Sequence, residues 1–155
     1  MSSVSVAVVG LGFGRNHVEA LAGLGGRADL VAVVDPVAPA DNPSLEGHPA
    51  LAAMLAVPHY HSLTDLLAVQ VPDIVAIATP IHTHLALGRE ALAAGANVLL
   101  EKPPTATLEE YRELVAASEA SGKAVQIGFQ ARGGAGVTAV RDAVGCGLIG
   151  EVTGI

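Results

Sequence analysis

The sequence is poor in cysteine, in aromatic residues and in basic residues. Of its 155 residues one is cysteine (Cys146), none is tryptophan, and 3% are aromatic. A single cysteine excludes an intramolecular disulfide framework and fits a reducing cytoplasm, which is the location we expect. The 15 acidic residues outnumber the 8 lysines and arginines, which gives a net charge of −7. This balance argues against a nucleic-acid partner or an anionic membrane surface.

Long apolar runs are also lacking. No uninterrupted apolar stretch approaches the roughly 18 residues that a membrane span needs, so no membrane association is expected. The apolar stretch near the N-terminus has no basic region before it and runs directly into glycines, so we interpret it as a strand rather than a signal peptide. Hydrophobic residues nevertheless make up 51% of the chain, mostly Ala, Val and Leu. This content excludes a disordered chain and predicts one domain with a real core.

Strand-like and helix-like segments alternate along the chain. The expected strands are β-branched or apolar runs at 4–9, 30–34, 57–61, 74–78, 98–100 and 124–129. The expected helices lie at 16–24, 49–56, 62–69, 84–94, 107–121 and 137–144. Short connections between such segments predict an α/β fold with a doubly wound parallel sheet, in the strand order 3-2-1-4-5-6.

A glycine-rich segment follows the first strand and opens the first helix. Gly10, Gly12 and Gly14 stand in the context of a dinucleotide-binding turn, where glycines let the backbone approach a pyrophosphate. The strict pattern would place its third glycine at Arg15. Either the turn is shorter, or Gly14 provides close helix–strand packing while Arg15 points outward, to a phosphate or simply to solvent. Phe13 belongs to this predicted cofactor segment, although its ring is expected to pack rather than to stack on adenine.

An acidic residue follows the second strand at the position that a dinucleotide site requires. Asp35 stands before Pro36, about 20 residues past the glycines. Its carboxylate is placed to accept hydrogen bonds from the adenosine ribose and would repel a 2′-phosphate, which favours NAD over NADP. The alternative is an ordinary turn aspartate before a proline.

Two H-x-H pairs are the only arrangement that suggests a metal. They are His59 with His61 and His82 with His84. No cysteine cluster or flanking carboxylate joins either pair, so we predict no metal site.

Four segments in this order, GLGFGRNH, VVDP, ATPIHTH and LLEKPPTATLEE, together resemble the Gfo/Idh/MocA family of oxidoreductases. The resemblance covers essentially the whole chain. It implies a Rossmann nucleotide-binding domain, followed by a second α/β domain, in an enzyme that oxidises or reduces sugars, polyols or related carbonyl compounds with NAD. It also implies that residues 1–147 are the NAD(P)-binding domain and that residues 148–155 begin a truncated substrate domain.

The resemblance also assigns roles to residues at the ends of two further strands. Lys102 is expected near the nicotinamide and the reacting carbon, as the catalytic residue that holds or protonates the substrate oxygen. Glu101 is expected to orient Lys102. Thr79, Pro80 and His84 resemble the family segment that borders the nicotinamide ribose. For His84 the alternative is a first-turn helix residue, and for Glu101 and Lys102 it is a surface pair.

Three functions therefore follow from the sequence. The first is the cofactor half of a dehydrogenase, inactive in isolation because substrate and proton-transfer residues of the second domain are missing. The second is a non-catalytic NAD(H)-binding module or sensor that needs a partner domain. The third, binding of another adenosine ligand such as S-adenosylmethionine, is disfavoured by the EKP segment at 101–103. Apolar surface at Val152 and Ile155, uncovered by a missing sheet, would promote association, so a homo-oligomer is among the expected states.

Overall fold

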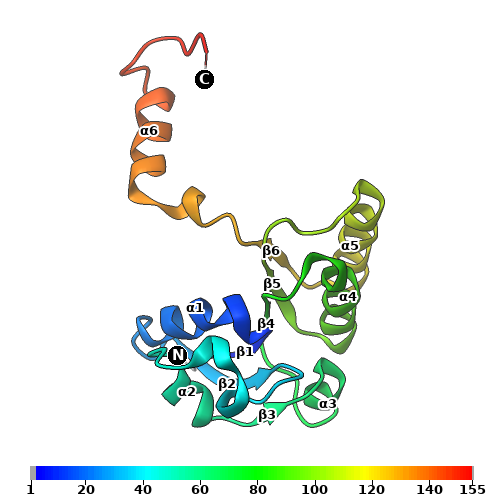
Figure 1. Cartoon of the computed structure of the whole chain (residues 1–155). Coiled ribbons are helices and arrows are strands. Elements are labelled where there is room, and N and C mark those ends of the chain that lie inside the picture. The colour runs from blue at the N-terminus through cyan, green and yellow to red at the C-terminus, as the bar shows by residue number, and fades with distance from the viewer. Residues whose placement is uncertain (1–2, 155) are drawn as a thin grey trace.

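Six parallel strands form a single sheet in the order β3-β2-β1-β4-β5-β6 (Figure 1). The computed structural model describes residues 3–154. Within them the strands are β1 (Val4–Val9), β2 (Ala28–Val34), β3 (His59–Tyr60), β4 (Ile74–Ile77), β5 (Asn97–Leu100) and β6 (Val125–Ile127). Every neighbouring pair is parallel. The doubly wound parallel sheet and its strand order are therefore confirmed.

Helices cover both faces of the sheet. One face carries α1 (Leu11–Ala22) and α2 (Leu51–Leu55), whose buried side chains share a cluster with β1 and β2. The other face carries α3 (Leu63–Leu67), α4 (His84–Ala94) and α5 (Leu108–Ser121). The connections contain short 3₁₀ turns, which are η1 (Pro39–Asp41), η2 (Pro43–Leu45), η3 (Ile81–Thr83) and η4 (Gln130–Gly133).

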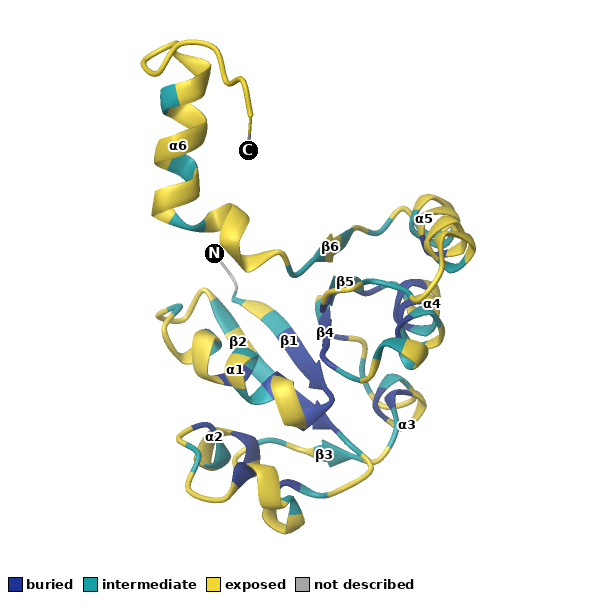
Figure 2. Ribbon diagram, turned by 45° about the horizontal axis from the view of Figure 1, so that its top comes forward, coloured by how far each residue is buried: buried dark blue, intermediate teal, exposed yellow. Residues whose placement is uncertain are grey.

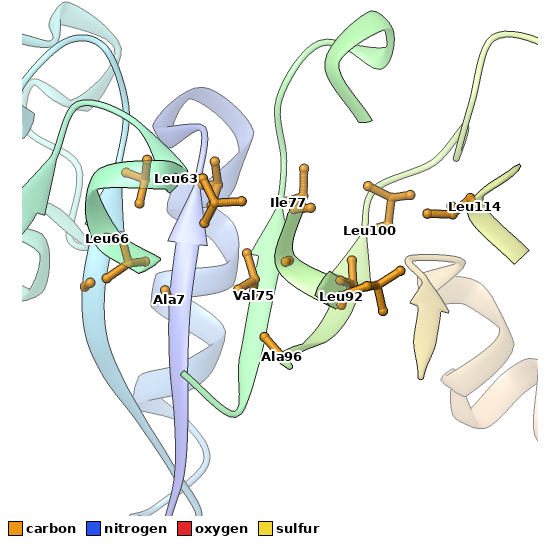
Figure 3. Packing of buried hydrophobic residues seen from close by; sticks show 14 residues of the cluster. Ala7, Leu63, Leu66, Val75, Ile77, Leu92, Ala96, Leu100 and Leu114 are labelled. Atoms are coloured by element: carbon orange, nitrogen blue, oxygen red, sulfur yellow. The ribbon is translucent and has the colours of Figure 1, made fainter. Parts of the chain in front are cut away.

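The central strands send alternate side chains into two separate cores. In β1, Ala7 and Val9 join the cluster under α3, α4 and α5, whereas Val6 and Val8 join the cluster under α1 and α2. Figure 3 shows the first cluster, in which Val75 and Ile77 of β4 lie close to side chains of the neighbouring helices. Because both faces are covered, a continuous apolar strand is favourable, as expected for a parallel sheet.

Most helix ends are where capping residues predict them. Ser62 accepts a hydrogen bond from the Asp65 N–H at 3.1 Å at the start of α3. Thr107 and Glu110 form the predicted capping box of α5. Gly95 and Gly122 end α4 and α5 in the left-handed conformation that glycine adopts without strain.

Most elements differ from their predicted bounds by one or two residues at an end, and in the first helix and the third strand the structure shows why. The first helix begins at Leu11 rather than at residue 16, because Gly10 alone makes the turn and the following glycines lie inside the helix. The third strand contains only His59 and Tyr60, since Pro58 has no N–H to donate and the chain turns away after Tyr60.

The last helix, α6 (Ala135–Gly145), stands away from the body of the domain (Figure 2). None of its residues is buried. Val140 within the helix is 61% exposed, and Leu148 after its end is 78% exposed. Val152, which was expected to be exposed, is 48% exposed, while Ile155 lies outside the described residues. The domain boundary at residue 147 remains a prediction. Over residues 3–154, no helix has both the length and the apolar character to cross a membrane.

Asp73 joins the N-terminal ends of β1 and β4. Its Oδ2 accepts hydrogen bonds from the Ser5 N–H at 2.8 Å and from the Ser5 hydroxyl at 2.7 Å. These bonds, with a smaller attraction from Lys123, hold the pKa of the Asp73 carboxyl below its ordinary value of 3.8. The ionised carboxylate therefore stabilises the folded state above that value, and its contribution is lost as the pH falls through the lowered pKa.

Asp73→Asn is therefore expected to be less stable than the wild type near neutral pH, with a difference that shrinks on acidification below pH 3.8. Urea unfolding at several pH values measures the stability difference near neutral pH and its decrease on acidification. Asp142→Asn, on exposed α6, is the matched control and should follow the wild type throughout. A stability difference that stays constant with pH would contradict the role of the Asp73 charge.

Candidate active site

The turn between β1 and α1 lies directly against the end of β4. Gly10 has a φ of +85°, and a Cβ at this position would lie 2.8 Å from the Ala78 carbonyl oxygen. The Gly10 N–H donates to the Val34 carbonyl at 2.8 Å. Only glycine satisfies both the conformation and the space. The turn therefore packs closely at the position where the sheet reverses its strand order, which is the usual ligand site of open α/β folds.

The first turn of α1 leaves two backbone donors for a ligand. The Leu11 N–H donates to Asp35 Oδ2 at 2.8 Å, and the Gly14 N–H to the Gly10 carbonyl at 3.1 Å. Across residues 3–154, the N–H groups of Gly12 and Phe13 have no hydrogen-bond acceptor. Gly12 is exposed, and a Cβ there would meet nothing within 4 Å. Free N–H groups at the positive end of a helix dipole favour an anion such as a pyrophosphate.

Asp35 closes the other side of the turn. Its Oδ1 accepts from the Val37 N–H at 2.9 Å, and its Oδ2 accepts from Leu11. Each carboxylate oxygen has a further lone pair, so the group can also accept hydrogen bonds from ribose hydroxyls. An anionic group of a ligand at this position would lie directly against the negative charge of the Asp35 carboxylate.

Four of the predicted site residues line one cleft of about 510 Å³: Gly10, Asp35, Thr79 and Pro80. They follow the ends of three different strands, β1, β2 and β4. Val9, Val34, Leu63 and Leu87 are among the residues that make its walls largely apolar. Besides Asp35 and Thr79, the polar members are His61, Ser62, Thr64, His82, Thr83 and Glu90. A cleft with apolar walls and polar side chains among its lining residues suits an adenosine, whose flat base packs on apolar walls while its ribose is hydrogen-bonded.

Within the glycine segment Gly10 lines the cleft, whereas Gly12, Phe13, Gly14 and Arg15 do not. The guanidinium of Arg15 donates to the Ser44 carbonyl at 2.6 Å, so this side chain fastens α1 to η2. Phe13 is 46% exposed, and its ring meets the His17 ring edge-on at 6.1 Å. Neither residue lines the cleft, and their predicted contacts with a cofactor remain predictions.

His84 lies beneath the cleft rather than in its wall. It is 1% exposed, with Nε2 at 2.8 Å from the Thr79 carbonyl oxygen and Nδ1 at 3.0 Å from the Pro103 carbonyl oxygen. Carbonyl oxygens only accept, so a doubly protonated ring satisfies both contacts and a neutral ring satisfies one. Through these contacts His84 joins the loop after β4 to the loop after β5. Its predicted contact with the cofactor is untested.

Lys102 follows β5 and faces a second, open cavity. This cavity, of about 370 Å³, is lined by Lys102, Phe129, Gln130, Ala131 and Arg132. The Lys102 N–H donates to Glu101 Oε2 at 3.2 Å, while the orienting role expected for Glu101 remains a prediction. Glu101 is 7% exposed and is not a surface residue.

The partner of Glu101 was not found from the sequence. His17 Nε2 lies 3.0 Å from Glu101 Oε1. The one available signal was the position of this histidine on the inward-facing stripe of α1, one residue before buried Val18. The sequence separation of the two residues hid the contact.

Histidines of the two H-x-H pairs contact backbone carbonyl groups of the loops around the cleft. His59 Nε2 lies 2.8 Å from the Asp35 carbonyl oxygen and His61 Nδ1 lies 3.2 Å from that of Pro36, with the two rings 4.8 Å apart. His82 is exposed whereas His84 is buried, so the second pair does not share a face. In the described part of the chain, no three His, Cys, Asp or Glu residues are grouped to hold a metal ion.

Comparison with known proteins identifies the family. Residues 4–129 match the Gfo/Idh/MocA family, described as "Oxidoreductase family, NAD-binding Rossmann fold". The chain belongs to this family. The resemblance found in the sequence is thereby confirmed, and the NAD-binding Rossmann fold of the family agrees with the cleft described above.

Relatives within the Gfo/Idh/MocA family include sugar and polyol dehydrogenases. Inositol 2-dehydrogenase 1 of Saccharopolyspora erythraea is 36% identical over 96% of this chain and 43% of its own length. The rhizopine catabolism protein MocA of Rhizobium meliloti is 31% identical over 98% of this chain and 45% of its own. The chain therefore spans less than half the length of these relatives.

A solved structure has the same fold with a cofactor bound. The WlbA dehydrogenase from Bordetella pertussis, in complex with NADH and UDP-GlcNAcA, superposes with a TM-score of 0.82 at 31% identity. The superposition covers 96% of this chain and 41% of that protein.

Gly14 supplies the close approach of α1 to the sheet. A Cβ at Gly14 would lie 2.7 Å from Cγ1 of fully buried Val8. Gly14→Ala is expected to lower the free energy of unfolding by about 1 kcal/mol, because overpacking costs about 1–3 kcal/mol and exceeds the helix-propensity gain. Gly12→Ala, in the same turn with free space, should instead raise it by about 0.5–1 kcal/mol. Chemical denaturation measures both; equal effects at the two sites would contradict the packing role.

Proposed function

We propose that this chain is the NAD-binding half of a dehydrogenase or reductase that moves a hydride between nicotinamide and a sugar, polyol or related carbonyl compound. The observation that carries the proposal is the pair of free N–H groups at the start of α1, directly after Gly10 of the cleft, together with the Asp35 carboxylate in the cleft wall. The names of the relatives support the substrate class.

The cleft and the adjoining start of α1 would each hold one part of the dinucleotide. The N–H groups of Gly12 and Phe13 would hold the pyrophosphate, Asp35 would hold the adenosine ribose, and the apolar walls beyond it would pack on adenine. Thr79 and Pro80, at the end of β4, would border the nicotinamide side. The nicotinamide supplies the hydride chemistry when it is bound.

Lys102 would act at the substrate oxygen. It lies at the carboxyl ends of β5 and β6, beside a cavity that also contains Gln130 and Arg132. From there the side chain would hydrogen-bond an oxygen of the substrate: as the neutral amine it would take the hydroxyl proton when the carbon is oxidised, and as the ammonium it would give that proton to the oxygen when the carbonyl is reduced. We further propose a cytoplasmic location, which the single cysteine supports, and self-association through exposed apolar residues such as Val140 and Leu148.

The cofactor preference is tested by calorimetric titration of the chain with NADH and NADPH. NADH is expected to bind at least about tenfold more tightly, because a 2′-phosphate would lie against the Asp35 carboxylate, a like-charge contact that costs several kcal/mol. Asp35→Asn keeps an acceptor for the Leu11 N–H and removes the charge. This variant should bring the two affinities closer together. Equal affinities in the wild type would refute the role of Asp35, and binding of neither would refute the cofactor site.

The catalytic role is tested by Lys102→Ala in a protein that joins this chain to a substrate domain. Turnover is expected to fall by about 10²–10⁴-fold, the usual contribution of a general acid or base, while NADH affinity changes by less than about threefold. Arg89→Ala, at an exposed ion pair with Glu113, is the control and should leave both unchanged. Unchanged turnover in Lys102→Ala would instead favour a non-catalytic NAD(H)-binding module.

A further inference from the structure

A nearly buried carboxylate lies next to Lys102. Glu101 is 7% exposed, and its two oxygens have different partners: Oε1 faces His17 Nε2 at 3.0 Å, and Oε2 accepts from the Lys102 N–H at 3.2 Å. A buried carboxylate without partners is strongly unfavourable, so these two contacts determine where the group rests. His17 is the only side chain of the described residues that is hydrogen-bonded to it.

The surrounding backbone limits movement of the carboxylate. A Cβ at Gly128 would lie 3.2 Å from Glu101 Oε1, so the chain after β6 packs closely on this group. The Gly128 N–H in turn donates to the Leu100 carbonyl at 2.8 Å. The carboxylate is therefore enclosed between α1, β5 and the end of β6, with His17 as its polar contact on the α1 side.

The direction of the hydrogen bond follows from the chemistry of the two groups. An ionised carboxylate only accepts, so Nε2 of His17 carries the proton. The bond connects α1, whose first turn would hold the pyrophosphate, to the residue just before Lys102. No cleft residue takes part in it, because neither His17 nor Glu101 lines the cofactor cleft.

We propose that His17 is a positioning residue for Lys102. Its Nε2–H holds the Glu101 carboxylate, and the other oxygen of that carboxylate fixes the Lys102 backbone at the edge where substrate approaches. The consequence for catalysis rests on the proposed function of Lys102, whereas the contact itself does not require a cofactor. The alternative is a simple fastening of α1 to the sheet, which would affect the whole domain rather than Lys102.

The test compares His17→Leu, which has no donor, with His17→Gln, whose amide keeps a donor close to the position of Nε2. Amide hydrogen exchange, followed by NMR on the ligand-free chain, is read at Lys102. Exchange at Lys102 is expected to accelerate about tenfold in His17→Leu, because the hydrogen bond to the carboxylate is no longer held. In His17→Gln it should stay within about threefold of the wild type.

Two ladder amides in the same molecule act as controls. The Glu101 N–H donates to the Ile77 carbonyl at 3.0 Å and the Gly128 N–H to that of Leu100 at 2.8 Å. Both should keep their wild-type exchange rates. Unchanged exchange at Lys102 in His17→Leu, or equal acceleration at all three amides, would overturn the positioning role. If His17→Leu does not fold, His17→Asn replaces it, since its shorter amide keeps polarity but does not reach Glu101.

The same samples separate this inference from the proposed function. NADH is titrated into the wild-type chain and into each variant. A wild-type chain that binds no NADH would refute the cofactor site, while the exchange rates would still decide the role of His17. NADH binding with unchanged Lys102 exchange in His17→Leu would keep the cofactor site and overturn the positioning role.

Discussion

The close backbone contact between the β1–α1 turn and the end of β4 is the constraint on which the cofactor cleft depends. At Gly10 a side chain would collide with the Ala78 carbonyl, and at Gly14 with Val8. With both positions free of side chains, α1 starts directly at the edge of the sheet. Its first turn then directly follows Gly10 of the cleft, and Asp35 reaches the Leu11 N–H. A side chain at either position would displace α1 and move its free N–H groups away from the end of β4.

A second set of contacts forms the edge around Lys102. The residues on either side of this lysine are each held by a histidine: Glu101 by His17 of α1, and the Pro103 carbonyl by His84 of α4. The two helices lie on opposite faces of the sheet, so the lysine loop is fixed from both layers. Because His84 also contacts the Thr79 carbonyl, this loop and the cleft wall share one support. The proposed reacting group and the proposed cofactor site are therefore parts of one rigid framework.

Much of the fold was predictable because the signals are local. The β-branched runs, the Thr107–Glu110 capping box and the glycine at the end of α4 each act within a few residues, and most elements formed within two residues of their predicted ends. The start of α1 was predicted too late, since glycines in a helix interior ordinarily weaken it. Here the tertiary contact at Val8 overrides that propensity. The short β3 shows the converse, a predicted strand that Pro58 cuts down.

The sequence by itself determined the parallel α/β architecture, the strand order and the presence of Gly10 and Asp35 at the cleft, because spacing along a βαβ unit dictates which residues reach the carboxyl edge of the sheet. Only the tertiary structure decided which side chains meet there. It turned Arg15 toward Ser44, buried His84 between two carbonyls and paired His17 with Glu101. These contacts join residues that are far apart in sequence, so their geometry depends on how the helices pack on the sheet, which no local pattern encodes.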